Sequence, residues 1–526
     1  MTRLGWAAIG VMVWLAAMGT AVAQDSPTDL KKTMDEITGR RKPTEEEAKE
    51  AVKEAEALRK FWAAVRREET IPGDLKGAAA AVPFGDKASG LKACLYVPTT
   101  YSPGRSWPLL VESSCRSAAA IQLKALQPMA EKHECLLLVV EYQFPQGRPV
   151  YQQKGWTREG TKDFTVVDRS LEDVLKDMAA DEKNLLALLK QVSARYTVES
   201  KAVGATGFLW PGLMAYRLAL TYPNVFSCCI VRTTTFDEQC LPKDVSRART
   251  KPFYIVYGER EPLWAVEASQ QAIDFFKRRQ FSKVVVERIP NSGVDPRPEI
   301  AANYFRSAVE ETLGPEQTAF YRAYSQAVRC VEGLPAAGDV AATEGLPSDK
   351  SASPGKTAPE SKPAPPPEAP PTGDAPASDD NPAPADQPAT ETRPAPQVKP
   401  APKPLPPPTA EVALASLKAF SEKYPKSAFK PGLDYITARL ALEKLSDRKQ
   451  ADELLRPFLR SPLREEPVAV EALFYLAEKV IDRTTAAPDA AAVLGAILAR
   501  RNTSPADIKR ATELRKEILS GKASAK

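Results

Sequence analysis

The chain has 526 residues, with 72 basic and 67 acidic side chains and a formal net charge of +5 at pH 7. A charge balance this close to neutral gives no whole-chain argument for nucleic acid, and we expect no such partner. The length is sufficient for two or three domains. The single histidine, His133, excludes a metal site with two histidine ligands and leaves one candidate for a histidine general base.

The N-terminus has the pattern of a secretory signal peptide. Arg3 precedes an apolar stretch from Leu4 to Met18, and Ala21-Val22-Ala23 supplies the small residues that signal peptidase requires. We therefore expect residues 1–23 to be removed after Ala23 and the mature protein to be periplasmic or secreted, with no membrane span. An uncleaved anchor is the alternative, because the apolar stretch approaches the ~20 residues of a membrane-spanning helix.

Between the signal and residue 76, the pattern predicts one charged amphipathic helix over residues 44–68. Thr44 and Glu47 form a capping box directly after Pro43. Apolar residues then recur at spacings of three and four, which defines one face of a helix: Ala48, Ala51, Ala55, Leu58, Trp62 and Val65. We expect this segment, within residues 24–76, to dock on the next domain, with self-association as the alternative.

From residue 77 to 331, short apolar runs alternate with helical patterns, which predicts an α/β domain with a mostly parallel sheet and helices on both faces. The predicted strands are Lys92–Val97, Trp107–Glu112, Leu136–Glu141, Ala202–Gly207, Ser227–Thr233, Pro252–Gly258 and Lys283–Ile289. The predicted helices cover residues 118–132, 172–196, 211–222, 265–280 and 297–313.

Residues 332–410 form a proline- and alanine-rich linker. Positions 332–409 hold 22 of the 48 prolines and no aromatic residue. Such a segment cannot bury enough apolar surface to fold, and its prolines favour an extended spacer. We therefore expect a disordered connection between two folded parts.

Residues 411–521 predict an all-α domain of helical hairpins. Prolines at 425, 462, 488 and 505 separate apolar-periodic segments, and the predicted helices cover residues 411–423, 431–446, 448–459, 467–482, 487–500 and 505–519. The segment FSEKYPKSAFKPGLDYITARLALEKL resembles tetratricopeptide-like repeats. That resemblance implies a protein or envelope partner bound through these helices.

Four segments between residues 85 and 315 occur in the order typical of one enzyme fold. They are LYVPTTYSPGRSWPLLVESSC, KAVGATGFLWPGLMAYRLALTYPNVFSCCIV, YIVYGEREPLW and ERIPNSGVDPRPEI. They resemble the entry strands, the nucleophile elbow, the acid loop and the histidine loop of secreted α/β-hydrolase-fold esterases of the feruloyl esterase and polyhydroxybutyrate depolymerase type. The resemblance implies an α/β-hydrolase-type sheet.

Placed on that pattern, the catalytic triad is degenerate. The family's G-x-S-x-G elbow reads Gly207-Phe208-Leu209-Trp210-Pro211, so Leu209 stands at the nucleophile position. Leucine has no lone pair for nucleophilic attack. The acid position falls at Glu261 and the histidine position at Val294, which cannot carry a proton. We therefore expect Glu261 to have nothing to orient.

The oxyanion loop is also altered, because Ser113-Ser114-Cys115 stands where these esterases carry His-Gly. Cys115 is the best substitute nucleophile, but it would need a base. We expect the only histidine, His133, to be a solvated surface residue at the opposite end of the sheet. A buried or disulfide-bonded Cys115 is the simpler interpretation.

Trp210 and Trp264 fall in loops at the predicted cleft, where their rings could stack a ligand. The alternative is that Trp210 fills space left by the missing serine and histidine. No cofactor or metal is expected. The chain has seven cysteines, and their pairing is left open.

The sequence favours an exported, non-catalytic binding or scaffolding protein of the cell envelope. An esterase or other hydrolase of altered mechanism, acting on carboxylic esters, is the first alternative. A structural envelope protein, whose linker crosses a wall layer, is the second.

Overall fold

The structure is a computed structural model. It describes scattered positions between 49 and 61, and then residues 63–85, 92–114, 119–142, 170–336 and 405–520 except Ser461, Pro467, Thr484 and Asn502. The predicted signal segment, Cys115, residues 337–404 of the predicted linker and most of the predicted apolar stripe of residues 44–68 lie outside the described residues.

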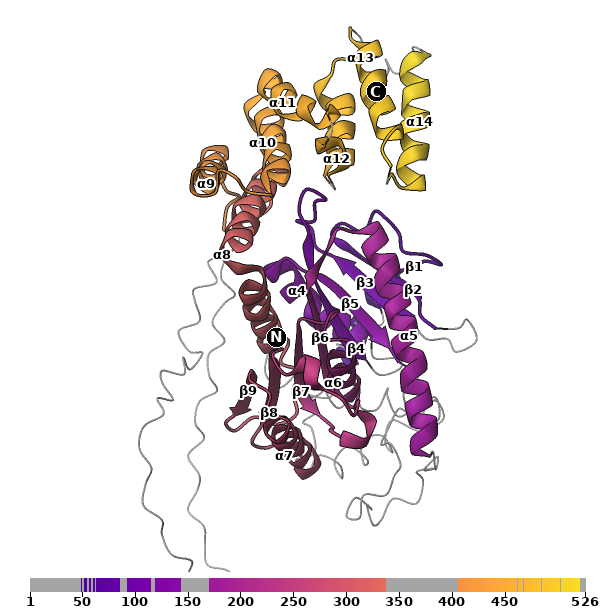
Figure 1. The fold of residues 1–526 in the computed structure, drawn as a ribbon, viewed down its shortest axis with the longest axis vertical. Coiled ribbons are helices and arrows are strands. Elements are labelled where there is room, and N and C mark those ends of the chain that lie inside the picture. The colour runs from indigo at the N-terminus through magenta and orange to yellow at the C-terminus, as the bar shows by residue number, and fades with distance from the viewer. Residues whose placement is uncertain are drawn as a thin grey trace, which may run out of the picture. The chain divides into compact units, whose positions relative to one another are not determined.

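Strands of the described residues form a nine-stranded sheet in the order β1-β2-β3-β5-β4-β6-β7-β8-β9 (Figure 1). Strand β3 pairs antiparallel with β2 and β5, whereas every other neighbouring pair is parallel. The strands are β1 Arg66–Arg67, β2 Ala78–Pro83, β3 Lys92–Val97, β4 Trp107–Ser114, β5 Leu136–Glu141, β6 Val198–Leu209, β7 Cys228–Thr234, β8 Phe253–Gly258 and β9 Val284–Ile289.

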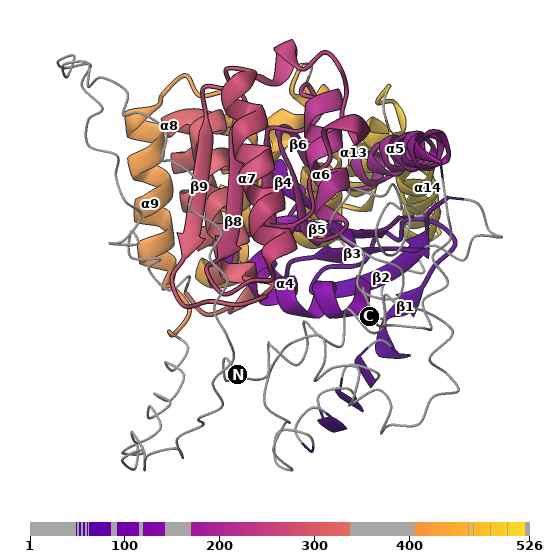
Figure 2. The ribbon, with the colours of Figure 1, turned by 90° about the horizontal axis from the view of Figure 1, so that it is seen from below.

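The two faces of the sheet bury alternate residues of the same strands, as the two-residue period of a strand requires. Leu136, Leu138 and Val140 of β5 belong to a core with helices α5 Leu171–Arg195, α6 Gly212–Thr221 and α7 Leu263–Arg278. The residues between them, Leu137 and Val139, belong to a second core with α4 Ala119–His133 and the first part of α8. Helices thus cover both faces, as predicted (Figure 2).

Helix α8, Pro298–Glu332, continues well beyond the predicted end at residue 313. It contains a kink at Gly314, where φ is 76°. Its second part carries Phe320, Tyr324 and Val328, which pack with the C-terminal helices in a further core. The sequence prediction ended at the Gly314-Pro315 break and missed this second helical segment.

The C-terminal region is all-helical, as predicted. It contains α9 Ala410–Lys423, α10 Lys430–Leu445, α11 Arg448–Leu455, α12 Ala469–Tyr475, α13 Ala487–Leu498 and α14 Pro505–Leu519. A short π-helical segment, Leu476–Val480, extends α12. The described residues from 405 onward belong to the same compact unit as the sheet.

Two features at the start of the sheet correct the sequence analysis. The helix predicted to run to residue 68 ends earlier, because Arg66 and Arg67 form β1 beside β2. Strand β2 itself was missed, since its sequence AAAAVP has few of the β-branched residues that mark strands. Val65, the last residue of the predicted apolar stripe, is buried in the core beside α4 and α8.

Among the residues that the structure describes, no helix has both the length and the apolar character needed to cross a membrane.

Candidate functional site

The turn after β6 has the backbone of a nucleophile elbow, with leucine at its centre. Leu209 ends β6 at a φ of +60°, a left-handed conformation that residues other than glycine rarely adopt. The carbonyl of Leu209 accepts a hydrogen bond from the Thr234 hydroxyl at 2.5 Å, and its side chain is buried. The strained turn therefore holds an apolar side chain at the position where the sequence resemblance predicts a nucleophile.

Close packing explains the two glycines around this turn. A Cβ on Gly207 would lie 2.7 Å from Cα of Gly212, and a Cβ on Gly212 would lie 2.0 Å from Oγ1 of Thr234. Pro211 precedes α6 with helical dihedral angles, which suits the fixed φ of proline. Strand β6, helix α6 and the end of β7 consequently pack closely together at this turn.

Glu261 lies just after β8, at the same edge, and its carboxylate is fully buried. It accepts hydrogen bonds from the Thr233 hydroxyl at 2.6 Å and from the Gly258 backbone N–H at 2.7 Å. Burial raises the pKa of Glu261, while the nearby Arg297 guanidinium acts in the opposite direction. The acid position is thus occupied by a carboxyl group whose hydrogen bonds come from the protein itself.

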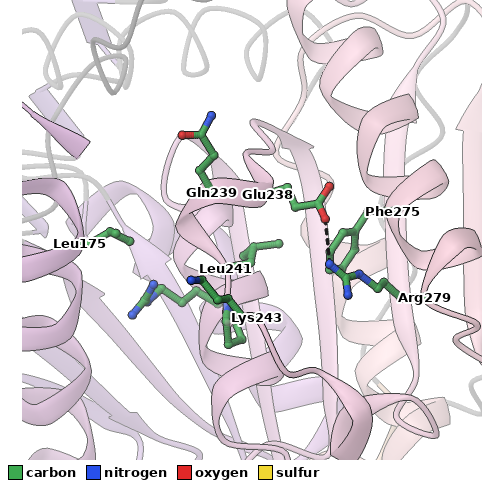
Figure 3. A pocket seen from close by; sticks show the side chains of 9 residues that line it. Leu175, Glu238, Gln239, Leu241, Lys243, Phe275 and Arg279 are labelled. Atoms are coloured by element: carbon green, nitrogen blue, oxygen red, sulfur yellow. Dashed lines mark hydrogen bonds and ion pairs between the residues drawn. The ribbon is translucent and has the colours of Figure 1, made fainter. Parts of the chain in front are cut away.

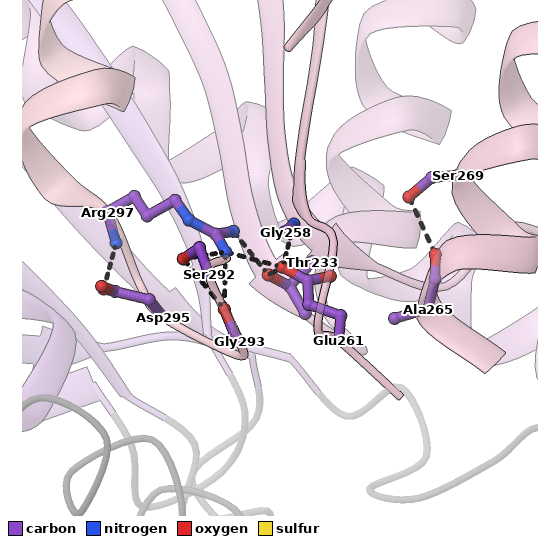
Figure 4. Close-up of polar contacts among 9 residues, drawn as sticks. All are labelled: Thr233, Gly258, Glu261, Ala265, Ser269, Ser292, Gly293, Asp295 and Arg297. Carbon is purple, nitrogen blue, oxygen red and sulfur yellow. Dashed lines mark hydrogen bonds and ion pairs between the residues drawn. The ribbon is translucent and has the colours of Figure 1, made fainter. Parts of the chain in front are cut away.

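Arg297 is the main partner of this acid, so the expectation that Glu261 has nothing to orient is wrong. Its guanidinium lies 2.8 Å from the Glu261 carboxylate, and the Arg297 side chain is 4% exposed. It also donates to the Thr233 hydroxyl at 2.9 Å, the Ser292 hydroxyl at 3.1 Å and the Gly293 carbonyl at 2.6 Å (Figure 4). Arg297 therefore connects the Glu261 carboxylate to the loop that contains Val294.

Val294 lies in this loop and is half-buried. The loop is fixed at one end by the contacts of Arg297 with Ser292 and Gly293 and at the other by the Asp295 carboxylate, which accepts from the Arg297 backbone N–H at 3.0 Å. Arginine stays protonated at any ordinary pH and has no acceptor atom. The group that faces the acid can therefore position it but cannot shuttle a proton.

Sequence analysis missed Arg297 and Thr233. Thr233 has a φ of +49°, unusual for a β-branched residue, and its hydroxyl lies between the carboxylate and the guanidinium. The only signal for Arg297 was an arginine between two prolines just before a helix. Nothing in that pattern indicates a partner 36 positions earlier in the chain.

A second ion pair lies beneath the elbow. Arg232 of β7 reaches under β6 to Glu112 of β4, with contacts of 2.5 and 2.6 Å to its two carboxylate oxygens. Both side chains are almost fully buried, and Arg232 also donates to the Pro296 carbonyl at 2.5 Å. Burial raises the pKa of Glu112 against the effect of Arg232. This ion pair connects β4 with β7 and, through the Pro296 carbonyl, with the loop that contains Val294.

Two residues of the predicted oxyanion loop, Ser113 and Ser114, are the buried last residues of β4. Ser113 lies in register with Gly207 of β6, so the oxyanion and elbow positions are adjacent. Cys115, the predicted spare nucleophile, lies outside the described residues.

His133 ends α4, just before β5 begins, at the opposite end of β5 from the carboxyl edge. The prediction of a solvated side chain is wrong. Both ring nitrogens are buried without a hydrogen-bond partner among the described residues. Burial, together with Lys132 and Arg306, lowers the pKa of His133 to about 4.

Trp210 and Trp264 meet at the carboxyl edge. Their rings stack with centroids 5.0 Å apart and an interplanar angle of 9°, and both side chains are half-exposed. Trp210 directly follows the elbow residue, and Trp264 lies at the start of α7, three positions after Glu261. The structure therefore brings together the two aromatic residues that sequence analysis selected.

Within the described part of the chain, no group of three or more histidine, cysteine, aspartate or glutamate side chains is arranged to hold a metal ion. The six described cysteines are buried, and none forms a disulfide bond with another described residue. Burial raises the pKa of Cys135 and of Cys228 to about 12, so neither is a reactive thiolate at neutral pH.

No protein-family model matches the sequence, and no curated protein is significantly similar to it. Solved structures of similar fold include a putative dipeptidyl aminopeptidase IV from Bacteroides ovatus (11% identity, 45% of this chain, 35% of that chain, TM-score 0.32). A second is a thermostable esterase (17% identity, 45% of this chain, 63% of that chain, TM-score 0.31). A third is a ferulic acid esterase from Anaeromyces mucronatus (9% identity, 46% of this chain, 96% of that chain, TM-score 0.31). The chain thus spans less than two thirds of the length of the first two of these proteins.

The strand order, the elbow after β6, the acid after β8 and the loop after β9 together define an α/β-hydrolase-type fold. A fold of this type does not determine function. The chemistry at the carboxyl edge therefore has to be argued from the residues of this chain.

Proposed function

We propose that this chain is a non-catalytic binding protein built on an α/β-hydrolase-type fold. The observation that carries the proposal is Leu209, an apolar side chain at the centre of a turn with the left-handed backbone of a nucleophile elbow. A leucine there can neither attack a carbonyl nor donate a proton. The turn itself remains, so the surrounding surface keeps its shape.

The contacts of Glu261 support the same proposal. In an acid–base triad the carboxylate orients a histidine, whereas here it binds Arg297 and Thr233. Since the guanidinium cannot release a proton near neutral pH, the acid and loop positions form a rigid structural connection. The edge of the sheet is suited to present a fixed surface rather than to transfer protons.

We place the ligand contact at the stacked Trp210 and Trp264 rings. The two rings are half-exposed and present a large, rigid apolar area, which costs little side-chain entropy on binding. The proposal extends to export through the N-terminal signal, to the cell envelope, and to a protein partner bound by the C-terminal tetratricopeptide-like helices.

The test is turnover of p-nitrophenyl acetate and p-nitrophenyl butyrate by the purified mature chain, together with labelling by a fluorophosphonate probe. We expect background rates and no labelling. Wild type and the Cys115→Ala variant should be indistinguishable. Turnover well above background would overturn the proposal, and its loss in Cys115→Ala would establish the alternative, a hydrolase of altered mechanism.

A further inference from the structure

A pocket lies on the side of the sheet that is covered by α5, α6 and α7, and its lining includes neither Leu209 nor Glu261. Its volume is about 420 Å³, within the ~300–1,000 Å³ range of small-molecule sites. It is lined by residues of α5, α6, α7 and the loop after β7 that contains the 3-10 turn Glu238–Cys240. None of its lining residues belongs to the cluster around Arg297.

One part of the pocket wall is apolar. Leu241 and Phe275 are core residues, and Leu175 and Pro242 are half-buried. Figure 3 shows Leu175 on one side of the open space and Phe275 on the other. A ligand in this space would bury apolar surface against side chains that are already held in place by the core, which favours an apolar body.

The polar part of the lining is mostly cationic. It contains Arg217, Lys243 and Arg279, with Glu238 as the only carboxylate. Glu238 is shared between two arginines, Arg278 at 2.7 Å and Arg279 at 3.2 Å.

Arg217 is held in place from outside the pocket. It is paired with Glu182 and donates to the Cys240 carbonyl at 2.6 Å. Lys243 is exposed and has no ion pair among the described residues. Together with Arg278 and Glu182, which pair with lining residues, the pocket region has four cationic side chains and two carboxylates. A net positive charge therefore lies beside the apolar part of the wall.

We propose that this pocket binds a small amphipathic carboxylate, with its apolar chain against Leu241 and Phe275 and its carboxylate beside Lys243. The inference goes beyond the proposed function and does not depend on it. The apolar wall requires a hydrocarbon body, and the unpaired ammonium group favours an anionic head over a neutral or cationic one. The second net positive charge comes from Arg278 and Arg279, which share the single carboxylate of Glu238.

The test is isothermal titration calorimetry of the full chain with octanoate, octanol and octylamine. We expect one octanoate per chain and at least tenfold weaker binding of octylamine. Added salt should weaken octanoate binding and leave octanol binding unchanged, because only the charged head is screened. Equal affinities for octanoate and octylamine would overturn the proposal.

Variants locate the site. Lys243→Glu should weaken octanoate binding at least tenfold, while the matched Lys190→Glu variant, an exposed charge reversal near the other end of α5, should not change it. Gln239→Trp should block both octanoate and octanol by filling the pocket without changing its charge. Octanoate binding that survives both Lys243→Glu and Gln239→Trp would place the ligand elsewhere and refute the assignment. Trp210→Ala should bind octanoate normally, which separates this pocket from the ligand surface of the proposed function.

Discussion

The turn at Leu209 and the loop at Glu261, the two positions that the sequence resemblance assigns to a nucleophile and an acid, differ from that catalytic pattern in opposite ways. At the elbow the backbone is that of a catalytic turn, with a φ of +60°, and the side chain is inert. At the acid loop the carboxyl side chain is present, and its partner is Arg297. The contrast shows that close packing of Gly207 and Gly212 determines the shape of the turn independently of any chemistry performed there.

The two regions are physically connected. Thr234 donates to the Leu209 carbonyl, and its neighbour Thr233 donates to Glu261. Arg297 then extends the connection to Gly293 in the loop after β9. The Leu209, Glu261 and Val294 positions are therefore connected through the adjacent Thr233 and Thr234 and through Arg297, with no histidine in the connection. Variants can separate its parts.

The largest expected effect is at the acid loop. Arg297→Met leaves the Glu261 carboxylate buried without its counterion, which should lower the free energy of unfolding by about 3–5 kcal/mol at pH 7. Urea unfolding measures it. The loss should shrink at acidic pH, because a protonated Glu261 needs no counterion.

Two variants are controls for this prediction. Glu261→Gln combined with Arg297→Met should recover much of the stability, since no buried charge then lacks a partner. Arg288→Met, at an exposed arginine 3.6 Å from Glu259, should change stability by less than about 1 kcal/mol. A cost for Arg297→Met no greater than that of Arg288→Met would show that the Glu261 pair does not hold this edge together.

The sequence was sufficient to predict the elements that pattern determines. The ranges of β3 and β5 match the prediction, because KACLYV and LLLVVE are short, mostly apolar runs that are buried on both faces of the sheet. The partner of Glu261 could not be predicted from the sequence, because Arg297 is brought to it by the pairing of β8 with β9. Long-range contacts between polar side chains leave no periodic signal.

A second prediction concerns His133, the only histidine of the chain, at the end of α4. Burial lowers the pKa of His133 from 6.5 to about 4, so the folded state binds this proton more weakly than the unfolded state does. The resulting stability is present above pH ~6.5 and is lost as the pH falls toward 4. Because the side chain is partly exposed, we expect about 1–2 kcal/mol rather than the ~3 kcal/mol of the full shift.

The measurement is the free energy of unfolding of wild type and His133→Gln at pH 7 and pH 4. The decrease between the two pH values should be smaller in the variant by that amount. Lys132→Gln, which removes one neighbouring positive charge, should reduce the decrease only in part. Identical pH dependence in wild type and His133→Gln would contradict the burial of this ring.

A third prediction tests the strain at the elbow. Leu209→Ala and Leu209→Gly both remove a buried side chain, so both should destabilise the protein. Glycine tolerates a φ of +60°, whereas alanine does not. Leu209→Gly should therefore be about 1–2 kcal/mol more stable than Leu209→Ala, the reverse of the order at an ordinary strand position. At Val231, in the middle of β7, the same pair of substitutions should show alanine as the more stable variant.

The smallest expected effect is the coupling between Trp210 and Trp264. These two residues connect the regions, because Trp210 follows Leu209 and Trp264 lies three positions after Glu261. Their parallel rings, 5.0 Å apart, should give a coupling energy of about 0.5–1.5 kcal/mol in a double-mutant cycle of Trp210→Ala and Trp264→Ala. Trp210→Ala combined with Tyr475→Phe in α12 should instead be additive. A coupling near zero would mean that each ring is free to contact a ligand separately, whereas the expected coupling means that a ligand meets the pair as one rigid surface.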